Sequence, residues 1–240
     1  MLNSSLTIKP IGIVHSPFKE KFGIPRQAAL IKSCSATIEL YQPFCSLDSV
    51  KGLDEFSDIW IIFGFHKNNN DIWRPLVRPP RLGGNKKIGV FASRSPFRPN
   101  GLGLSRIELR EVLIKNNKAS LRIACPDVVD GTPVYDIKPY IHYADSNTDA
   151  ICGFAQDAPN ADITVAFNPE ALLEITTLEQ TNYQDLREII IEVLKQDPSP
   201  AYKDKHSLNR YGFRLFDLNI VWTQSENLIT VEQVHKFCSK

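Results

Sequence analysis

The sequence predicts a mainly β fold, with an antiparallel sheet closed into a barrel or a sandwich over the first 145 residues and a small α+β part after it. Three observations lead to this prediction. Short segments rich in β-branched and aromatic residues recur along the first part, and each is bounded by Pro, Gly, Asn or Asp. The glycine patterns of nucleotide-binding folds are absent, and strands do not alternate with helices. Beyond residue 145 the hydrophobic period becomes that of helices.

Seven strands are expected in the first part. Their close spacing and the turn residues between them favour antiparallel neighbours, as in barrels and sandwiches. The predicted strands cover residues 8–14, 36–40, 59–65, 88–92, 104–114, 120–124 and 134–140.

A polar connection that begins at Asp145 divides the chain into two expected domains, 1–145 and 146–240. Two helices are predicted to follow it, and then strands over residues 212–222 and 228–237. Because runs of helices and strands succeed each other without βα alternation, the second domain is predicted to be a small α+β unit.

The two helices have recognisable starts. Pro169 suits the first helical position, with Asn168 before it. Thr181 and Gln184 form the pattern of a capping box ahead of the second helix. The apolar residues at helical spacing are Leu172, Leu173, Ile175 and Leu178 in the first helix, and Leu186, Ile189, Ile190, Val193 and Leu194 in the second.

The composition is that of an ordinary globular chain. With 240 residues, of which 42% are hydrophobic, it can bury the core of one large or two small domains. The net charge of +1 means that any contact with nucleic acid must come from a local patch. The five cysteines are scattered and form no C-x-x-C pair, so neither a disulfide framework nor a zinc site is expected. No leader-like segment and no apolar run of membrane-spanning length occurs, which favours a cytoplasmic location and no membrane contact.

Residues 72–107 form the most unusual stretch, because it holds eight cationic side chains and no acidic one. Its prolines and glycines would hold guanidinium groups and backbone N–H donors at fixed positions, which suits an anionic or nucleotide-like ligand. A solvated basic loop is the alternative. The eight residues are Arg74, Arg78, Arg81, Lys86, Lys87, Arg94, Arg98 and Arg106.

A second basic region interleaves aromatic and cationic side chains before the final strands. Such a mixture can stack on nucleobases while it neutralises phosphates, and an ordinary exposed loop is the equal alternative. Its members are Tyr202, Lys203, Lys205, His206, Arg210, Tyr211 and Arg214.

Five ordered blocks of sequence carry a specific resemblance. They read IGIVHSPFKEKFGIPRQ (11–27), FSDIWIIFGFH (56–66), WRPLVRPPRLGGN (73–85), GVFASRSPFRPN (89–100) and DVVDGTPVYDIKPY (127–140). Together these blocks resemble the TrmO family, also called TsaA-like or YaeB, over roughly residues 8–145. The runs QDPSPAY and GFRLFDLNIVW resemble the C-terminal domain of the bacterial members.

The resemblance implies an S-adenosylmethionine-dependent tRNA methyltransferase that acts on N6 of threonylcarbamoyladenosine at position 37, with threonine tRNA as the expected substrate. It also implies a single-sheet β-barrel and a homodimer with the donor site near the subunit interface. One departure is visible, because the family usually has Asn-Pro where this chain has Asn100-Gly101. Glycine presets a turn less firmly than proline does.

Methyl transfer from a sulfonium is a direct displacement that depends on positioning and electrostatics, so no metal is expected. By the resemblance, Asp127 and Asp130 are the candidate catalytic residues, as hydrogen-bond acceptors for the substrate amine or the ammonium of the donor. Both could instead be turn residues that bond their own backbone, and His66 could be a structural histidine. The expected donor-binding residues are Arg26, Gln27, Ala28, His66, Lys67, Arg94, Leu104, Cys125, Pro126, Asp127, Asp130, Gly131 and Thr132.

Two other classes of function stay open from the residues alone. A non-catalytic RNA- or nucleotide-binding module would use the same basic patch. A hydrolase would need a nucleophile and a base, and the sequence shows none of the usual motifs for that pair.

Overall fold

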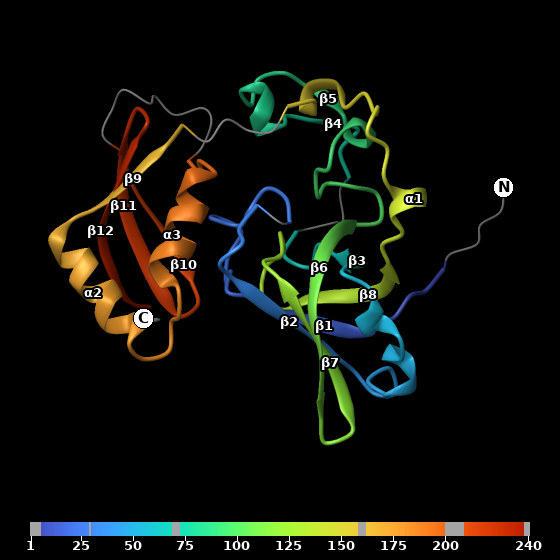
Figure 1. Cartoon of the computed structure of the whole chain (residues 1–240). Coiled ribbons are helices and arrows are strands. Elements are labelled where there is room, and N and C mark those ends of the chain that lie inside the picture. Colours follow the sequence, from blue (N-terminus) through green and yellow to red (C-terminus); the bar gives the residue numbers. More distant parts are fainter. Residues whose placement is uncertain (1–5, 29, 69–72, 158–161, 200–208, 238–240) are drawn as a thin grey trace.

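Six strands form a closed antiparallel barrel in the order β1-β2-β7-β6-β3-β8 (Figure 1). The structure is a computed structural model that describes residues 6–28, 30–68, 73–157, 162–199 and 209–237. The pairing of β8 with β1 closes the sheet, so the predicted barrel is confirmed and the sandwich is not formed. The barrel strands are β1 (Gly12–His15), β2 (Ser35–Leu40), β3 (Asp58–Gly64), β6 (Leu102–Lys115), β7 (Lys118–Ala124) and β8 (Thr132–Pro139).

Alternating apolar residues fill the barrel. Burial recurs at every second position of β2 and through most of β3, so one face of each strand points to the interior. The interior is built from β-branched and aliphatic side chains, which pack well on a pleated surface. Ile38, Ile61 and Leu121 are among those with no exposed surface. At the far end of β6 and β7, Asn116 and Asn117 take left-handed conformations (φ 52° and 57°), which suit a tight hairpin turn.

The segment between β3 and β6 lies over one end of the barrel. It contains the short pair β4 (Leu76–Val77) and β5 (Ile88–Gly89) and two 3-10 turns (Pro80–Leu82 and Val90–Ala92). The strand predicted over residues 88–92 is therefore wrong beyond Gly89, where the chain coils. Further short elements are the 3-10 turns Asp48–Val50, Leu53–Glu55 and Gly153–Ala155 and the helix α1 (His142–Asp145).

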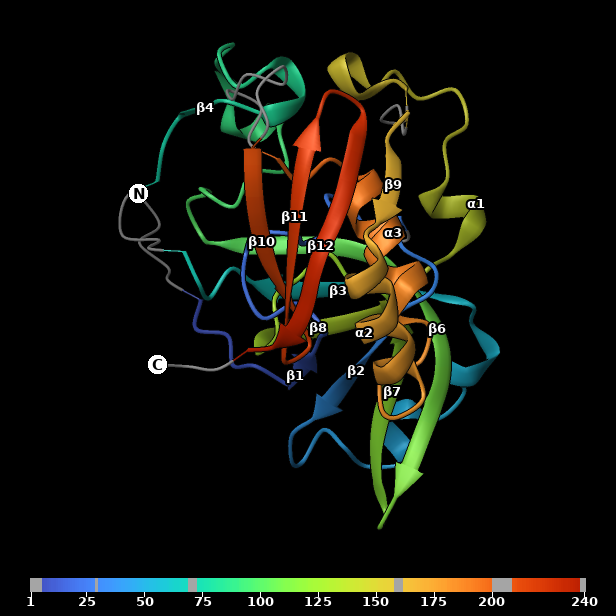
Figure 2. The ribbon, with the colours of Figure 1, turned by 90° about the vertical axis from the view of Figure 1, so that its left-hand side faces the viewer.

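Residues 162–199 and 209–237, called here the C-terminal region, form a four-stranded sheet in the order β10-β11-β12-β9. Two helices, α2 and α3, cover one face of it (Figure 2). The elements are β9 (Thr164–Phe167), α2 (Pro169–Glu179), α3 (Leu186–Lys195), β10 (Asn209–Leu215), β11 (Leu218–Ser225) and β12 (Leu228–Lys236). In the described ranges, no helix is long and apolar enough to cross a membrane.

The predicted start of α2 is confirmed, since Asn168 Oδ1 accepts a hydrogen bond from the amide of Ala171 at 2.7 Å. Other expectations for this region are wrong. Asp185 precedes α3 without a side-chain cap, so the predicted capping box does not form. The single strand expected over residues 212–222 is a hairpin that reverses at Phe216 (φ 56°), and β9 was not expected at all.

The barrel and the C-terminal region share a core. Phe18 and Ile31, from the loops of the barrel, are buried among the residues of α3 and the four-stranded sheet. A backbone hydrogen bond also joins the two parts, since the amide of Phe216 donates to the carbonyl of Pro17 at 2.6 Å. The domain boundary at residue 145 stays a prediction.

Cys34 and Cys125 form a disulfide at the edge of this shared core. The scattered cysteines indicated no disulfide framework, and this single disulfide was not expected. Its physical reason lies in the register of the barrel, which pairs Ser35 of β2 with Ala124 of β7 and so sets the two cysteines side by side.

Candidate functional site

One rim of the barrel gathers much of the predicted site. Antiparallel pairing sets Gly64 opposite Leu102, so β3 leaves the barrel where β6 enters it. β7 leads to the same rim and ends before Asp127, whose carboxylate meets the hydroxyl of Ser105 on β6. His66, Ser105 and Asp127 therefore come together from distant parts of the chain.

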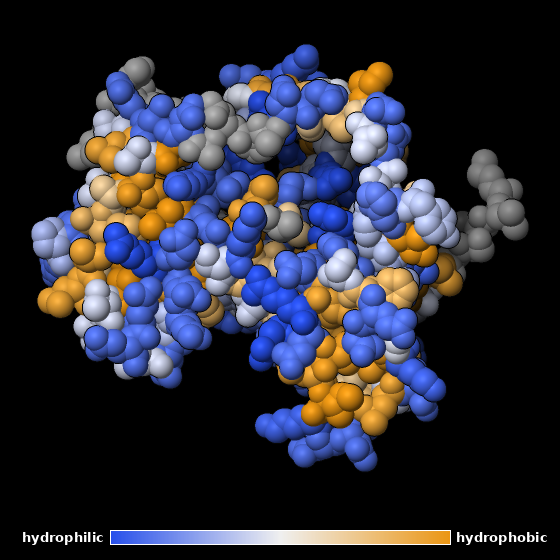
Figure 3. All heavy atoms as spheres, in the orientation of Figure 1, coloured by the Kyte–Doolittle hydropathy of each residue, from blue (hydrophilic) through white to orange (hydrophobic). Residues whose placement is uncertain are grey.

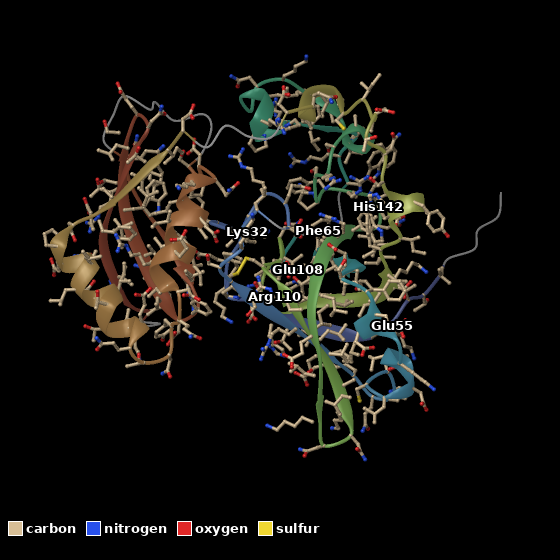
Figure 4. The ribbon with its side chains drawn as sticks, in the orientation of Figure 1. Lys32, Glu55, Phe65, Glu108, Arg110 and His142 are labelled. Carbon is tan, nitrogen blue, oxygen red and sulfur yellow. A yellow bond between two sulfur atoms is a disulfide. The ribbon has the colours of Figure 1, made fainter. Side chains whose placement is uncertain are left out.

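A cavity of about 180 Å³ opens at this rim. Pockets that enclose a whole ligand usually measure about 300–1,000 Å³, so this cavity can hold part of a ligand while the rest lies across the rim. Figure 4 shows Phe65 between the barrel and the segment that lies over it. The lining residues are Lys21, Ile24, Phe63, Gly64, Phe65, His66, Lys67, Asn68, Pro96, Asp127, Val128, Val129 and Thr132.

The lining both supports and extends the prediction from sequence. It includes the predicted residues His66, Lys67, Asp127 and Thr132, but also apolar residues that were not predicted. Phe63 and Phe65 lie at the end of a sequence block that carries the resemblance, and this was the signal available for them. A larger hollow of about 450 Å³ lies at the opposite end of the barrel, beside the β6–β7 hairpin, and its lining includes none of the predicted residues.

Asp127 is the central polar group of the cavity. Its partly buried carboxylate accepts the Ser105 hydroxyl at 2.7 and 3.0 Å and the backbone amide of Ala28. Desolvation raises the pKa of this carboxyl group, while its hydrogen bonds and the nearby Arg94 guanidinium oppose the rise. Such a carboxylate at a cavity wall suits a cationic or N–H-bearing group of a ligand.

Two further predicted residues connect the segments around Asp127. Arg94 donates a hydrogen bond from Nη1 to the side-chain oxygen of Gln27. Gln27 precedes Ala28, whose amide reaches Asp127. Arg94 is exposed at the rim, where its remaining donors can meet an anionic ligand group.

His66 stands at the mouth of the cavity. Its Nδ1 lies 3.4 Å from the hydroxyl of Thr132, which itself donates to the carbonyl of Val129 at 2.6 Å. Desolvation by burial lowers the pKa of His66, and the positive charge of Lys67 lowers it further. The imidazole is therefore mainly neutral at neutral pH and can both donate and accept a hydrogen bond.

Asp130 is engaged with the protein itself. Its Oδ1 accepts the amide of Ser16 at 2.9 Å, and its Oδ2 pairs with the ammonium of Lys19 at 2.9 Å. Lys67 also reaches this loop, since its ammonium donates to the carbonyl of Lys19 at 3.0 Å. Both carboxylate oxygens of Asp130 have partners from the loop after β1, and Asp130 is outside the cavity lining, so Asp127 is the better placed carboxylate.

Several predicted residues lie outside the cavity lining. Arg26 donates to the carbonyl of Asp197 in the C-terminal region at 3.0 Å. Leu104 is 54% exposed on β6, and Cys125 is buried in the disulfide. Pro126 and Gly131 belong to the loop between β7 and β8, where they shape the backbone around Asp127.

Residues 73–107, called here the Arg-rich segment, hold some cations that bond to the protein and others that are exposed. Arg98 donates to the carbonyls of Ser93 at 2.8 Å and Val90 at 3.3 Å, so it braces its own loop. Arg81 donates to the carbonyl of Asp157. Figure 3 shows hydrophilic residues along the hollow beneath this segment. The exposed cations of the segment include Arg74, Arg78, Lys86 and Lys87.

The second basic region is described only in part. Tyr202, Lys203, Lys205 and His206 lie outside the described residues. Arg210 is described and pairs with Glu232 at 3.2 Å. Across the described part of the chain, no group of three or more His, Cys, Asp or Glu side chains is placed to hold a metal ion.

Comparisons with known proteins cover both parts of the chain. The model of the tRNA-methyltransferase O N-terminal domain matches residues 13–146, and that of the TrmO C-terminal domain matches residues 160–237. The tRNA (adenine(37)-N6)-methyltransferase of Escherichia coli K12 is 47% identical over 220 residues, 91% of this chain and 93% of its own. A putative S-adenosylmethionine-dependent methyltransferase of Pseudomonas aeruginosa, RcsF, is 43% identical over 90% of this chain and 91% of its own. The crystal structure of TrmO from Pseudomonas aeruginosa superposes with a TM-score of 0.80 at 35% identity, and covers 97% of this chain and 99% of its own.

Proposed function

This chain belongs to the tRNA-methyltransferase O family, and we propose that it transfers a methyl group from S-adenosylmethionine to N6 of threonylcarbamoyladenosine at position 37 of tRNA. The family membership confirms the prediction of a tRNA (adenine(37)-N6)-methyltransferase. It supports an enzyme over the binding module and the hydrolase that the residues alone left open.

The observation that carries the assignment of the site is the Asp127 carboxylate in the wall of a largely apolar cavity, with Arg94 at the rim. The donor has an adenine, an ammonium and a carboxylate. Phe63 and Phe65 offer apolar faces for the adenine, Arg94 a bidentate partner for a carboxylate, and Asp127 an acceptor for N–H groups.

The residues of this chain contribute by holding and orienting the reactants. When bound, S-adenosylmethionine supplies a methyl group that its sulfonium makes electrophilic. A displacement of this kind is accelerated by fixed positions and by charges that are already in place. Asp127 or the neutral His66 would accept a hydrogen bond from the amine, and the methylated amine gives up its proton readily, so a strong base is unnecessary.

The tRNA is proposed to contact the exposed cations of the Arg-rich segment, and also the second basic region with Lys203, Lys205 and Arg210, as the sequence predicts. Cationic side chains neutralise phosphates, and loop bases of RNA are usually unstacked before they are read. A cytoplasmic location and threonine tRNA as the substrate belong to the same proposal.

A homodimer is a further part of the proposal. Trp73 and Leu76, in the Arg-rich segment, are 48% and 52% exposed, and Phe91 is 75% exposed. Exposed apolar side chains of this kind fit a partner subunit that covers the donor site. Sedimentation velocity at micromolar concentration tests it, and a monomer would contradict it.

The decisive experiment compares two tRNAs. Purified protein with labelled S-adenosylmethionine should methylate tRNA that carries the threonylcarbamoyl group, and mass spectrometry of the nucleosides should find the label on N6 of that base. The same tRNA without the threonylcarbamoyl group is the control. Equal turnover of both tRNAs would contradict recognition of the modified base.

A further inference from the structure

Residues 20–28 and 30–33, called here the donor segment, carry Gln27 and Ala28 to the edge of the cavity. Within this segment, Gln27 meets Arg94 and Ala28 meets Asp127. Much of what holds the segment on either side of these two residues comes from the C-terminal region.

The first residues of the donor segment, Glu20 and Gly23, contact β10. The amide of Arg214 donates to Glu20 Oε1 at 3.0 Å. Gly23 has a φ of 85° and lies on Phe213 so closely that a Cβ would stand 2.8 Å from the ring. Only glycine fits both the conformation and the contact, so this part of the segment is shaped to pack on the sheet.

The last residues of the donor segment, Lys32 and Ser33, contact α3. One oxygen of Glu192, Oε2, accepts the amides of both Lys32 and Ser33, each at 2.9 Å. The carbonyl of Lys32 accepts Arg110 Nη2 of the barrel at 2.8 Å. Lys32 and Arg110 lie on the side of the barrel that faces the C-terminal region (Figure 4). Glu192 thus fixes the peptide where the segment passes from the cavity to β2.

We propose that Glu192 is a positioning residue for the methyl-donor site, through which the C-terminal region holds the donor segment in its binding conformation. The inference rests on the proposed function, because it takes Gln27, Ala28 and Asp127 as the donor site. It gives the C-terminal region a part in binding the donor that is separate from any contact with tRNA.

The physical argument concerns preorganisation. A carboxylate that accepts two backbone amides makes two charge-assisted hydrogen bonds, which are stronger than neutral ones. The two amides that donate to Glu192, those of Lys32 and Ser33, lie four and five residues after Ala28 in the same short segment. Without it, the segment gains conformations in which Gln27 and Ala28 leave their partners, and the donor must select the competent one at a cost in affinity.

The experiment measures the affinity of the full chain for S-adenosylmethionine by calorimetry without RNA. Glu192→Ala should weaken binding by about tenfold, as for the loss of charge-assisted bonds. Glu192→Gln keeps an acceptor oxygen and should restore affinity to within about threefold of the wild type. Glu192→Asp keeps the charge but is one methylene shorter, so it should bind S-adenosylmethionine more weakly than the wild type. This variant replaces Glu192→Ala in the test if the alanine variant does not fold.

Glu174 of α2 provides the matched control. Like Glu192, Glu174 accepts a hydrogen bond from the backbone, here a single one from the amide of Val234 at 2.8 Å. Both of these residues belong to the C-terminal region, so this bond does not involve the donor segment. Glu174→Ala should lower the thermal midpoint while leaving donor affinity unchanged. In turnover assays, Glu192→Ala should raise the KM for the donor and leave kcat at saturating donor close to that of the wild type.

The outcomes separate the two proposals. A wild-type protein that does not bind S-adenosylmethionine would remove the proposed function, and the positioning role with it. Donor binding by the wild type with equal affinity in Glu192→Ala or Glu192→Asp would overturn the positioning role alone. So would an equal loss of affinity in Glu174→Ala, because the effect would then be one of general stability.

Discussion

Removal of the Ser105 hydroxyl should destabilise the protein more when residue 127 is a carboxylate than when it is an amide. Ser105 is buried and bonds both oxygens of Asp127, at 2.7 and 3.0 Å. Hydrogen bonds to charged groups contribute about 1.5–3 kcal/mol and neutral ones about 0.5–1.5 kcal/mol. Ser105→Ala should therefore cost about 2 kcal/mol in the wild type and about 1 kcal/mol in an Asp127→Asn background.

The pH dependence of this effect has a definite sign. Desolvation raises the pKa of Asp127 in the folded state above its unfolded value of about 3.9. A raised pKa means that the folded state binds the proton more tightly, so the contribution of Asp127 is most favourable below the unfolded pKa and is lost as pH rises through the folded pKa. Since the Ser105 bond lowers that pKa, Ser105→Ala should raise it further. The destabilisation by Ser105→Ala should therefore shrink as the pH falls from 7 towards 4.

The assay is urea unfolding of the wild type, both single variants and the double variant at pH 7. The coupling between the two positions should be about 1 kcal/mol, within the range for side chains in direct contact. Asp127→Asn should also bind S-adenosylmethionine poorly although it folds, because it keeps the shape of the site without the charge. A coupling smaller than about 0.3 kcal/mol, or a cost of Ser105→Ala that grows on acidification, would refute the reasoning.

Three further outcomes are expected. Arg94→Ala should weaken donor binding without RNA by about 1.5–3 kcal/mol, measured by calorimetry, and a folded variant with wild-type affinity would remove Arg94 from the site. Gly101→Pro should lower the free energy of unfolding by about 2 kcal/mol, because Gly101 has a φ of 60° and donates its amide to a carbonyl at 3.3 Å, and proline can do neither; an unchanged thermal midpoint would contradict this. Combined replacement of Arg78, Lys86 and Lys87 by alanine should weaken tRNA binding and reduce the slope of log K against log salt by about 2–3, and an unchanged slope would place the RNA elsewhere.

The barrel could be predicted because its signal is local. The segment that becomes β3 is a short run of β-branched and aromatic residues that begins at Asp58 and ends at Gly64, so its whole signal lies within seven consecutive positions. The hairpin between β10 and β11 gave no such signal, since its turn contains Phe216, a residue that rarely adopts a left-handed conformation. The four residues of β9 are too few and too little buried to show a period. Cys34 and Cys125 are 91 positions apart, and only the register of β2 and β7 reveals that they are neighbours.

The lining of the candidate cavity was predictable where a motif and a strand end coincide, as for His66 and Asp127. It was not predictable where the partner lies far along the chain. The guanidinium of Arg26 reaches the carbonyl of Asp197, which the sequence did not indicate, and its contact with the donor stays a prediction. Ser105 looked like an ordinary strand residue, and only the antiparallel pairing of β6 with β7, which sets Leu109 opposite Ile123, brings it beside Asp127.

The anchoring of the donor segment also bears on how the protein matures during synthesis. Glu192 and Arg214 meet this segment across sequence separations of 160 and 194 residues. Because a chain leaves the ribosome from its N-terminus, the barrel strands can pair long before α3 and β10 have emerged. During that interval the donor segment has neither of these two contacts. We therefore expect the proposed donor site to be the last part to form in a nascent chain, and a chain that stops short of β10 to lack the contacts that hold the donor segment on that strand.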